Sequence, residues 1–292
     1  MKAAVLGSPI AHSLSPVLHR AGYAALGLDD WTYTAVECAE AGLPALLDSC
    51  GPGWAGLSLT MPLKRAVLPL LDTVDPVADA AGGANTVVFD DGRRHGYNTD
   101  VAGMVAALAE AGVTAPTSAV ILGAGATACS AVAALRDLGL TTVTVAVRDP
   151  ARAGALQSVA DRLGLAVTLE PLAERGAGQL SPPDLLISTV PAGAADFLVE
   201  GWVAGVPAPA CVFDVVYAPW PTRLARAMQE AGATVVGGFE LLLHQAGGQF
   251  ELMTGHRPAP LEPMRAAGRA ELARRPAAAR RGPSGRVRPA CS

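Results

Sequence analysis

Short apolar runs alternate with amphipathic, helix-like segments through the first hundred residues. The runs predict strands at 2–7, 31–38 and 54–60, and the amphipathic segments predict helices at 17–27, 41–50 and 63–72. Two further strand patterns flank the turn Asp90-Asp91-Gly92-Arg93, which predicts a β-hairpin over residues 83–100. Alternating strands and helices of this kind are typical of an α/β layer structure.

After Asp100 the strand-like segments are apolar along their whole length. A helix is predicted over 101–113, strand–helix units follow it to residue 238, and a last helix is expected over 239–255. Strands without polar alternation are typical of a parallel sheet that helices cover on both faces. The pattern therefore predicts a doubly wound, Rossmann-type sheet for this part of the chain.

The composition narrows the class of protein. With 292 residues, 51% of them hydrophobic, the chain has material for one large domain or two of ordinary size. Its net charge of −4 gives no basis for binding nucleic acid or an anionic membrane. No leader-like segment opens the chain, and the uncharged stretch near 114–135 is interrupted by "GAGAT", so we expect a cytoplasmic protein without a membrane span. The five cysteines lack metal-ligand spacing, so we expect reduced thiols and no metal.

The end of the chain differs from the rest. From Arg265 to Ser292 there are eight Arg and one acid, Glu271, among Ala, Pro and Gly. A segment with so little to bury predicts disorder over 265–292. An arm that binds nucleic acid or a partner is the alternative.

The segment "AVILGAGATA" places a GxGxxA pattern after an apolar strand and at the start of a helix. Its residues are Gly123, Ala124, Gly125, Ala126, Thr127 and Ala128. Glycine lets the backbone approach a pyrophosphate, and the helix N-terminus supplies N–H donors and a positive dipole end. The pattern predicts a dinucleotide site; a turn that serves only packing is the alternative.

The end of the next strand reads "VAVRDPARA" and selects between the two nicotinamide cofactors. Arg148 and Arg152 are two guanidiniums that can bind a ribose 2′-phosphate, which favours NADP. Asp149 keeps NAD open, because a carboxylate can bind the ribose hydroxyl instead. The three residues could also be no more than an exposed helix cap, with Asp149 before Pro150.

Lys64, in "GLSLTMPLK", is one of only two lysines in the sequence, and the other is Lys2. All remaining Lys or Arg positions are Arg. A guanidinium keeps its proton at any working pH, so a position that must exchange a proton requires lysine. Asp100, in "GYNTD", is a candidate partner that would hold the ammonium. The alternatives are a surface lysine and a helix N-cap.

These motifs together resemble the shikimate dehydrogenase family from about residue 5 to 257. The matching segments are "GSPIAHSLSPVLHRAGYAALGL", "GLSLTMPLK", "GGANTV", "GYNTDVAG", "DVVYAPWPTRL" and "HQAGGQFELMTG". The resemblance implies a substrate-binding α/β domain at 1–101 and 238–264, an NADP-binding Rossmann domain at 102–237, and an active site in the cleft between them. It also implies the NADPH-dependent reduction of 3-dehydroshikimate to shikimate in aromatic amino-acid biosynthesis, by a monomer or homodimer.

Roles follow from the resemblance residue by residue. It implies that Lys64 and Asp100 are the catalytic pair. It implies a substrate pocket formed by Ser13, Ser15, Thr60, Lys64, Asn85, Asp100, Tyr217 and Gln245. It implies that NADP contacts residues 123–128, Arg148, Arg152, Val215 and Gly238.

Three departures from the family pattern leave the substrate and cofactor open. Ser58 stands where Asn is usual, Glu240 and Leu241 stand where Gly and Met are common, and Asp149 replaces a small polar residue. They motivate an alternative: a paralogue that acts on quinate or an aminoshikimate, with NAD in place of NADP. A sensor that binds the same ligands without turnover is the more distant alternative.

Overall fold

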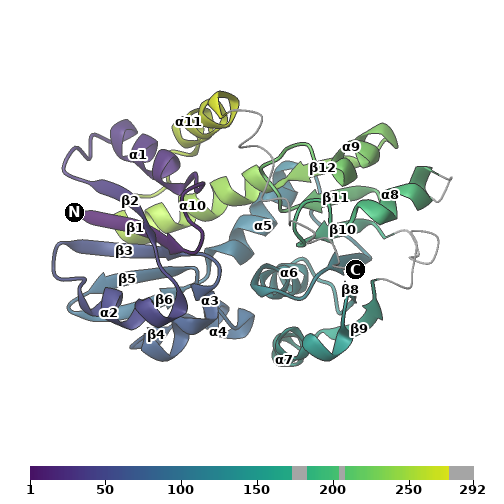
Figure 1. The fold of residues 1–292 in the computed structure, drawn as a ribbon, viewed down its shortest axis with the longest axis horizontal. Coiled ribbons are helices and arrows are strands. Elements are labelled where there is room, and N and C mark those ends of the chain that lie inside the picture. Colours follow the sequence, from purple (N-terminus) through teal and green to yellow (C-terminus); the bar gives the residue numbers. More distant parts are fainter. Residues whose placement is uncertain (173–182, 204–207, 276–292) are drawn as a thin grey trace, which may run out of the picture.

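The computed structural model describes residues 1–172, 183–203 and 208–275. Two six-stranded sheets lie at the two ends of the molecule, and long helices run between them (Figure 1). This arrangement confirms the predicted α/β class with a Rossmann-type second part.

The first sheet has the strand order β2-β1-β3-β5-β6-β4. Its strands are β1 (Lys2–Gly7), β2 (Thr32–Glu37), β3 (Trp54–Leu59), β4 (Thr73–Val74), β5 (Thr86–Asp90) and β6 (Arg93–Tyr97). The antiparallel pair β5–β6 confirms the predicted hairpin, and its central residues Asp91 and Gly92 both have positive φ, at 45° and 74°. β1 and β3 are parallel neighbours, so the loops after Gly7 and Leu59 leave from the same edge of the sheet.

The second sheet is parallel throughout, in the order β12-β11-β10-β7-β8-β9. Its strands are β7 (Ala119–Leu122), β8 (Thr142–Val147), β9 (Ala166–Pro171), β10 (Leu185–Ser188), β11 (Cys211–Asp214) and β12 (Thr234–Gly237). The chain builds outward from β7 in both directions, so the order reverses between β7 and β10. Ligands of such sheets bind at the carboxyl ends of the strands beside this switch point.

Two helices cross between the sheets, α5 (Thr99–Glu110) and α10 (Gly238–Thr254). A Cβ on Gly103 would lie 2.9 Å from the backbone nitrogen of Gln245, so the two helices approach closely at this glycine. The contact fixes the N-terminal turn of α5, which carries Asp100, beside the face of α10 that carries Gln245.

The remaining helices cover the sheets. They are α1 (Ser15–Ala25), α2 (Leu43–Asp48), α3 (Leu63–Ala66), α4 (Pro76–Ala81), α6 (Ala126–Asp137), α7 (Gly154–Leu163), α8 (Asp196–Val203), α9 (Arg223–Glu230) and α11 (Leu261–Arg274), with short 3-10 turns at 40–42, 68–70 and 150–152. The predicted helix at 63–72 is therefore wrong in length, since α3 ends at Ala66 and a 3-10 turn containing Pro69 follows it. The short elements β4 and α4 were not expected, although Asp75 caps α4 by accepting a hydrogen bond from the Val77 N–H at 2.9 Å.

The structure contradicts predicted disorder over part of the C-terminal segment. Residues 265–274 belong to α11, which packs on α1, while 276–292 lie outside the described residues. Met264 is fully buried, and Arg265 has only 9% of its surface exposed. The helix gains its stability from these contacts with α1, α5 and α10, which composition alone does not reveal.

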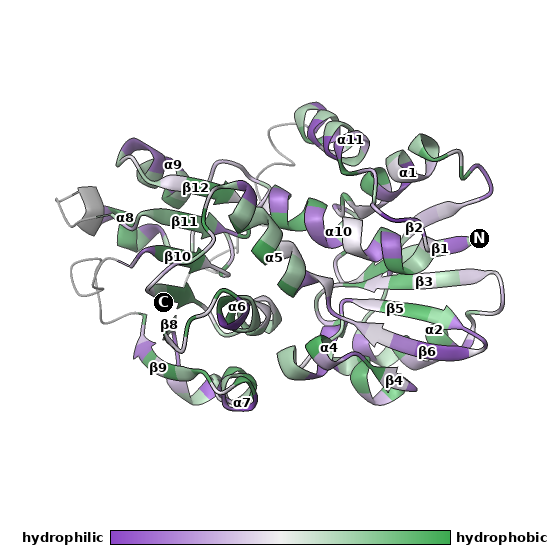
Figure 2. Ribbon diagram, turned by 180° about the vertical axis from the view of Figure 1, so that it is seen from behind, coloured by the Kyte–Doolittle hydropathy of each residue, from purple (hydrophilic) through white to green (hydrophobic). Residues whose placement is uncertain are grey.

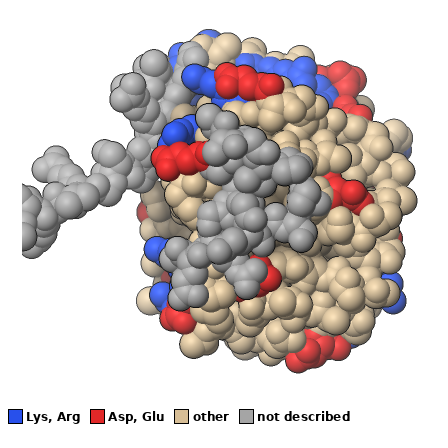
Figure 3. Space-filling model, turned by 90° about the vertical axis from the view of Figure 1, so that its right-hand side faces the viewer, with Lys and Arg blue, Asp and Glu red and all other residues tan. Residues whose placement is uncertain are grey.

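The surfaces follow from this packing. In Figure 2 hydrophobic colour gathers on inner strands such as β5, β10 and β11, whereas β6, which is mostly half-buried, is hydrophilic. On the face in Figure 3, acidic and basic side chains lie next to each other near the rim, and most of the visible described surface is uncharged. No helix in the described part of the chain is long and apolar enough to cross a membrane.

Candidate active site

A cavity of about 440 Å³ lies between the two sheets, with walls from both. The first sheet contributes the ends of β1 and β3, the second contributes the segment after β11, and α5 and α10 close it between them. Many of the predicted site residues line it: Ser13, Ser15, Thr60, Lys64, Asp100, Thr127, Val215, Tyr217, Gly238 and Gln245. Predicted residues up to 232 positions apart in the sequence, Ser13 and Gln245, thus meet in one cleft.

Lys64 and Asp100 form an ion pair at the wall of this cavity. The distance from Lys64 Nζ to Asp100 Oδ2 is 2.5 Å, and the side chains are 14% and 7% exposed. Lys64 is therefore not a surface lysine. Asp100 is not the helix cap either, because Asn98 is the N-cap residue of α5 and accepts the Asp100 N–H at 3.0 Å.

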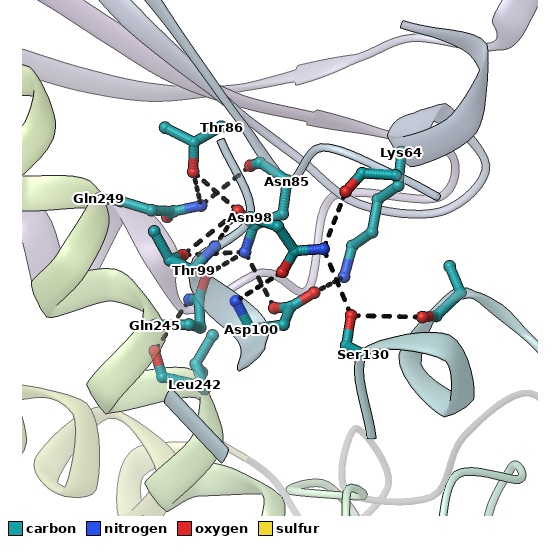
Figure 4. A network of polar contacts seen from close by, with 12 residues as sticks. Lys64, Asn85, Thr86, Asn98, Thr99, Asp100, Ser130, Leu242, Gln245 and Gln249 are labelled. Carbon is teal, nitrogen blue, oxygen red and sulfur yellow. Dashed lines mark hydrogen bonds and ion pairs between the residues drawn. The ribbon is translucent and has the colours of Figure 1, made fainter. Parts of the chain in front are cut away.

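Asn85 holds the other carboxylate oxygen of Asp100 (Figure 4). Its Nδ2 donates to Asp100 Oδ1 at 2.9 Å and approaches Gln245 Oε1 at 3.4 Å, while its Oδ1 accepts the N–H of Thr99 at 2.9 Å. Asn85 is 1% exposed and lies behind the cavity wall rather than in it. A buried carboxylate with both oxygens occupied has one orientation, so Asp100 presents Oδ2 to Lys64.

A second buried chain of hydrogen bonds supports Asn85, and the sequence reasoning missed most of it. Tyr33 donates to Ser58 Oγ at 2.6 Å, and Ser58 donates to Gln249 Oε1 at 2.8 Å. Gln249 Nε2 then donates to the backbone oxygen of Asn85 at 3.0 Å. Gln249 lies one helical turn after Gln245, and that i, i+4 spacing on one face of α10 was the available signal.

Ser58, one of the three departures, thus donates its hydroxyl proton to Gln249 and accepts one hydrogen bond from Tyr33. His19 stacks on Tyr33 with ring centroids 4.0 Å apart, and burial lowers the pKa of its imidazole to about 3. A neutral ring beneath Tyr33 adds packing without adding charge under the cavity.

The Gly-rich segment forms a tight turn at the start of α6. Gly123 has φ of +103°, and a Cβ there would lie 2.7 Å from Thr189 Oγ1. Gly125 is the N-cap residue of α6 and no side chain caps the helix. The first N–H groups of α6 are thus left for a ligand, and their donors and dipole suit a pyrophosphate.

Arg148 and Arg152 are exposed at the end of β8, beside the Gly-rich turn, and neither lines the cavity. Asp149 accepts the Ala151 N–H at 3.0 Å and is the N-cap residue of the turn that begins at Pro150. The cap alternative is therefore correct for Asp149.

The segment after β11 carries Val215 and Tyr217 into the cavity, and Asp214 anchors it. Asp214 is buried and accepts the hydroxyl of Thr222 at 2.7 Å and the Val216 N–H at 3.2 Å. Burial raises the pKa of Asp214, and these hydrogen bonds oppose that shift. Asp214 and Thr222 both lie in "DVVYAPWPTRL". The motif therefore contained a signal for this anchor that the sequence reasoning did not use.

Gly238 begins α10 directly against this segment. A Cβ on it would lie 1.9 Å from the backbone oxygen of Val215, so only glycine allows the approach. Leu241 lines the cavity, but Glu240 does not. Glu240 instead pairs with Arg265 and with Arg269 at 3.0 Å, so its carboxylate faces α11 and not the cofactor end.

Glu110, Glu240 and His244 place three ligand-type atoms within 4.8 Å of one another. The guanidinium of Arg265 already contacts both carboxylates, with Nη2 at 2.8 Å from Glu110. The arginine supplies the positive charge that a metal ion would bring to this cluster.

Comparisons with known proteins agree with this geometry. Residues 5–87 match the family model described as the shikimate dehydrogenase substrate binding domain, and residues 238–267 match the shikimate 5′-dehydrogenase C-terminal domain. A shikimate dehydrogenase (NADP(+)) of Citrifermentans bemidjiense is 38% identical over 88% of this chain and 90% of its own length. The crystal structure of Mycobacterium tuberculosis shikimate dehydrogenase has a TM-score of 0.82 at 42% identity, over 92% of this chain and 99% of that one. A Thermus thermophilus shikimate 5-dehydrogenase solved with NADP(H) and shikimate has a TM-score of 0.77 at 34% identity, over 92% and 99%.

Proposed function

The chain belongs to the shikimate dehydrogenase family, and from that premise we propose that it catalyses the reversible NADPH-dependent reduction of 3-dehydroshikimate to shikimate, a step of aromatic amino-acid biosynthesis. The observation that carries the proposal is the Lys64–Asp100 pair, which lies in a cavity between a substrate domain and a dinucleotide-type sheet. The proposal includes a substrate-binding domain formed by residues 1–101 and 238–264, and an NADP-binding domain formed by residues 102–237.

The residues at the second sheet fit NADP. The uncapped start of α6 would hold the pyrophosphate, Arg148 and Arg152 would hold the 2′-phosphate, and Val215 with Gly238 would border the nicotinamide. When bound, NADPH supplies a hydride to the ketone carbon.

The protein's own groups complete the reaction. As charge develops on the ketone oxygen, the Lys64 ammonium stabilises it and donates a proton to it. Asp100 holds that ammonium in place, and Asn85 fixes the carboxylate. In the reverse direction the same lysine accepts the hydroxyl proton. Lys64 is a lysine, on this mechanism, because the step needs a cation that can exchange its proton.

Substrate recognition would use the polar groups at the rim of the cavity. Ser13, Ser15 and Tyr217 would bind the carboxylate, and Thr60 and Gln245 would face the ring hydroxyls. Of the three departures, Asp149 caps a turn and Glu240 faces α11, so neither supports a change of substrate. Ser58 lines the cavity, but its hydroxyl is used by Tyr33 and Gln249.

Initial rates with paired substrates and cofactors test the proposal. Shikimate and NADP should give the highest kcat/KM, with quinate and NAD each far lower. The matched control is the same enzyme with shikimate omitted. A preference for quinate or NAD would contradict the proposed specificity, and shikimate binding without turnover would contradict the proposed catalysis.

Replacing the two arginines should change cofactor choice. In the Arg148→Ala/Arg152→Ala variant we expect KM for NADP to rise about 10- to 100-fold, since two charge-assisted contacts with a phosphate are lost. KM for NAD should change little, because NAD carries no 2′-phosphate. Arg136→Ala, an arginine at the far end of α6, is the control and should leave both values unchanged. Equal losses with NADP and NAD would place the 2′-phosphate elsewhere.

A further inference from the structure

The loop between β1 and α1, residues 8–14, carries Ser13 and leads into Ser15, and both serines line the cavity. Backbone bonds hold the loop at two points: the Ser8 N–H donates to Met61 O at 3.0 Å and the Ser13 N–H to Ile10 O at 2.9 Å. Between them His12 is exposed and lines the cavity mouth. The carbonyl of His12, directly before Ser13, is a further point at which this loop is held.

The last helix reaches this loop. α11 packs along α1 so closely that a Cβ on Gly268 would lie 2.7 Å from Leu18 Cδ2. Its C-cap residue is Arg275, whose Nη1 donates to the backbone oxygen of His12 at 2.5 Å. The contact joins positions 263 residues apart.

Arg275 is held where it makes this contact. Its Nε lies 3.3 Å from Glu271 Oε1, one helical turn earlier, and its side chain is only 18% exposed. A planar guanidinium fixed at one edge by a carboxylate has little freedom at the other. The cationic group is thus fixed on the carbonyl that precedes Ser13.

The end of α11 also lies close to a residue of the cavity wall, since Tyr217 and Leu272 of α11 pack against the same apolar cluster. Burial raises the pKa of Tyr217, and the positive charge of Arg275 opposes that shift. Ser13, Ser15 and Tyr217 are neutral donors, whereas the substrate proposed above is an anion. Arg275 is a cation bonded to the loop that carries Ser13, and it follows Leu272 of the Tyr217 cluster by three residues.

We propose that Arg275 is a positioning residue for substrate binding, which fixes the Ser13–Ser15 loop through the His12 carbonyl and brings positive potential to the carboxylate end of the cavity. The inference rests on the proposed function. It lies outside what the matched C-terminal family model covers, since that match ends at residue 267.

The test compares two neighbouring arginines in the full-length protein. Arg275→Ala should raise KM for shikimate about 5- to 10-fold, the loss expected for one charge-assisted hydrogen bond, with kcat and KM for NADP unchanged. Arg274→Ala is the matched control, since Arg274 also pairs with Glu271 but is 74% exposed and makes no described contact with the loop. Arg275→Lys should give an intermediate KM, because it keeps the charge but not the fork.

Two further readouts separate this role from a structural one. Wild-type KM for shikimate should rise with salt more steeply than that of Arg275→Ala, since the variant lacks the charge that salt screens. Shikimate binding measured by calorimetry should weaken in the same ratio as KM. Unchanged KM and affinity in Arg275→Ala, or a joint loss of kcat, both KM values and melting temperature, would overturn the inference. A wild-type protein without turnover would contradict the proposed function instead, and calorimetry would still test Arg275.

Discussion

Lys64→Arg should lose turnover by about 10²- to 10⁴-fold, the contribution typical of a positioned general acid–base. The guanidinium keeps the positive charge and can still pair with Asp100, so the electrostatic part of the site is retained. It cannot give up a proton at any working pH, so the proton step is lost. The loss should appear in kcat with shikimate and NADP at saturating concentrations.

Lys2→Arg is the matched control, because it makes the same substitution at the only other lysine of the chain, on the exposed first residue of β1. It should have wild-type rates. The melting temperature and NADPH affinity of Lys64→Arg should also match those of the wild type, which would separate lost chemistry from lost folding. Turnover within a fewfold of wild type in Lys64→Arg would remove Lys64 from the proton transfer.

The α/β class could be predicted because the signals are local. Apolar runs such as 119–122 and 185–188 are buried strands, and the Asp91-Gly92 pair specifies its own hairpin turn. Lys64 could be singled out because lysine is so rare in this chain. From the residues Asp100 was only a candidate partner, and the family resemblance assigned the pair, since a separation of 36 positions carries no distance information by itself.

Features that depend on distant neighbours could not be predicted. The composition of 265–292 suggests disorder, but α11 forms because Met264 and Gly268 pack on its neighbours and Arg265 pairs with Glu110 and Glu240 on two other helices. Glu240 was one of the departures that left substrate and cofactor open, but its direction is decided by Arg265 and Arg269 of α11. Gln249 was overlooked because its partners Ser58 and Asn85 lie more than 160 positions away.

This dependence on distant contacts also explains why the site is rigid where chemistry needs it. Asp100 is oriented by Asn85, and Asn85 by Thr99, Gln245 and Gln249, which come from both α5 and α10. The two helices that join the sheets therefore also set the catalytic carboxylate. A change of the α5–α10 crossing would move the carboxylate relative to Gln245.

Asp100→Asn should reduce kcat about 100-fold or more, by removing the charge that holds and orients the Lys64 ammonium. The asparagine can still accept from Asn85 Nδ2 through its oxygen. Its NH₂ group would then face Lys64 Nζ. Two hydrogen-bond donors would lie against each other where the wild type has a 2.5 Å ion pair. Asn98→Ser, which keeps a capping oxygen at the start of α5, is the control and should retain most of the activity.

A double-mutant cycle decides whether the two residues act as one unit. If Asp100 works only by holding Lys64, then Lys64→Met/Asp100→Asn should be about as slow as Lys64→Met alone, because the second change removes support from a group already lost. If the rate loss of the double variant instead equals the product of the two single losses, Asp100 has an independent role in binding the substrate or in moving the proton. Melting curves of all four proteins are needed beside the rates, since a single replacement leaves a partly buried charge without its partner and the double replacement does not.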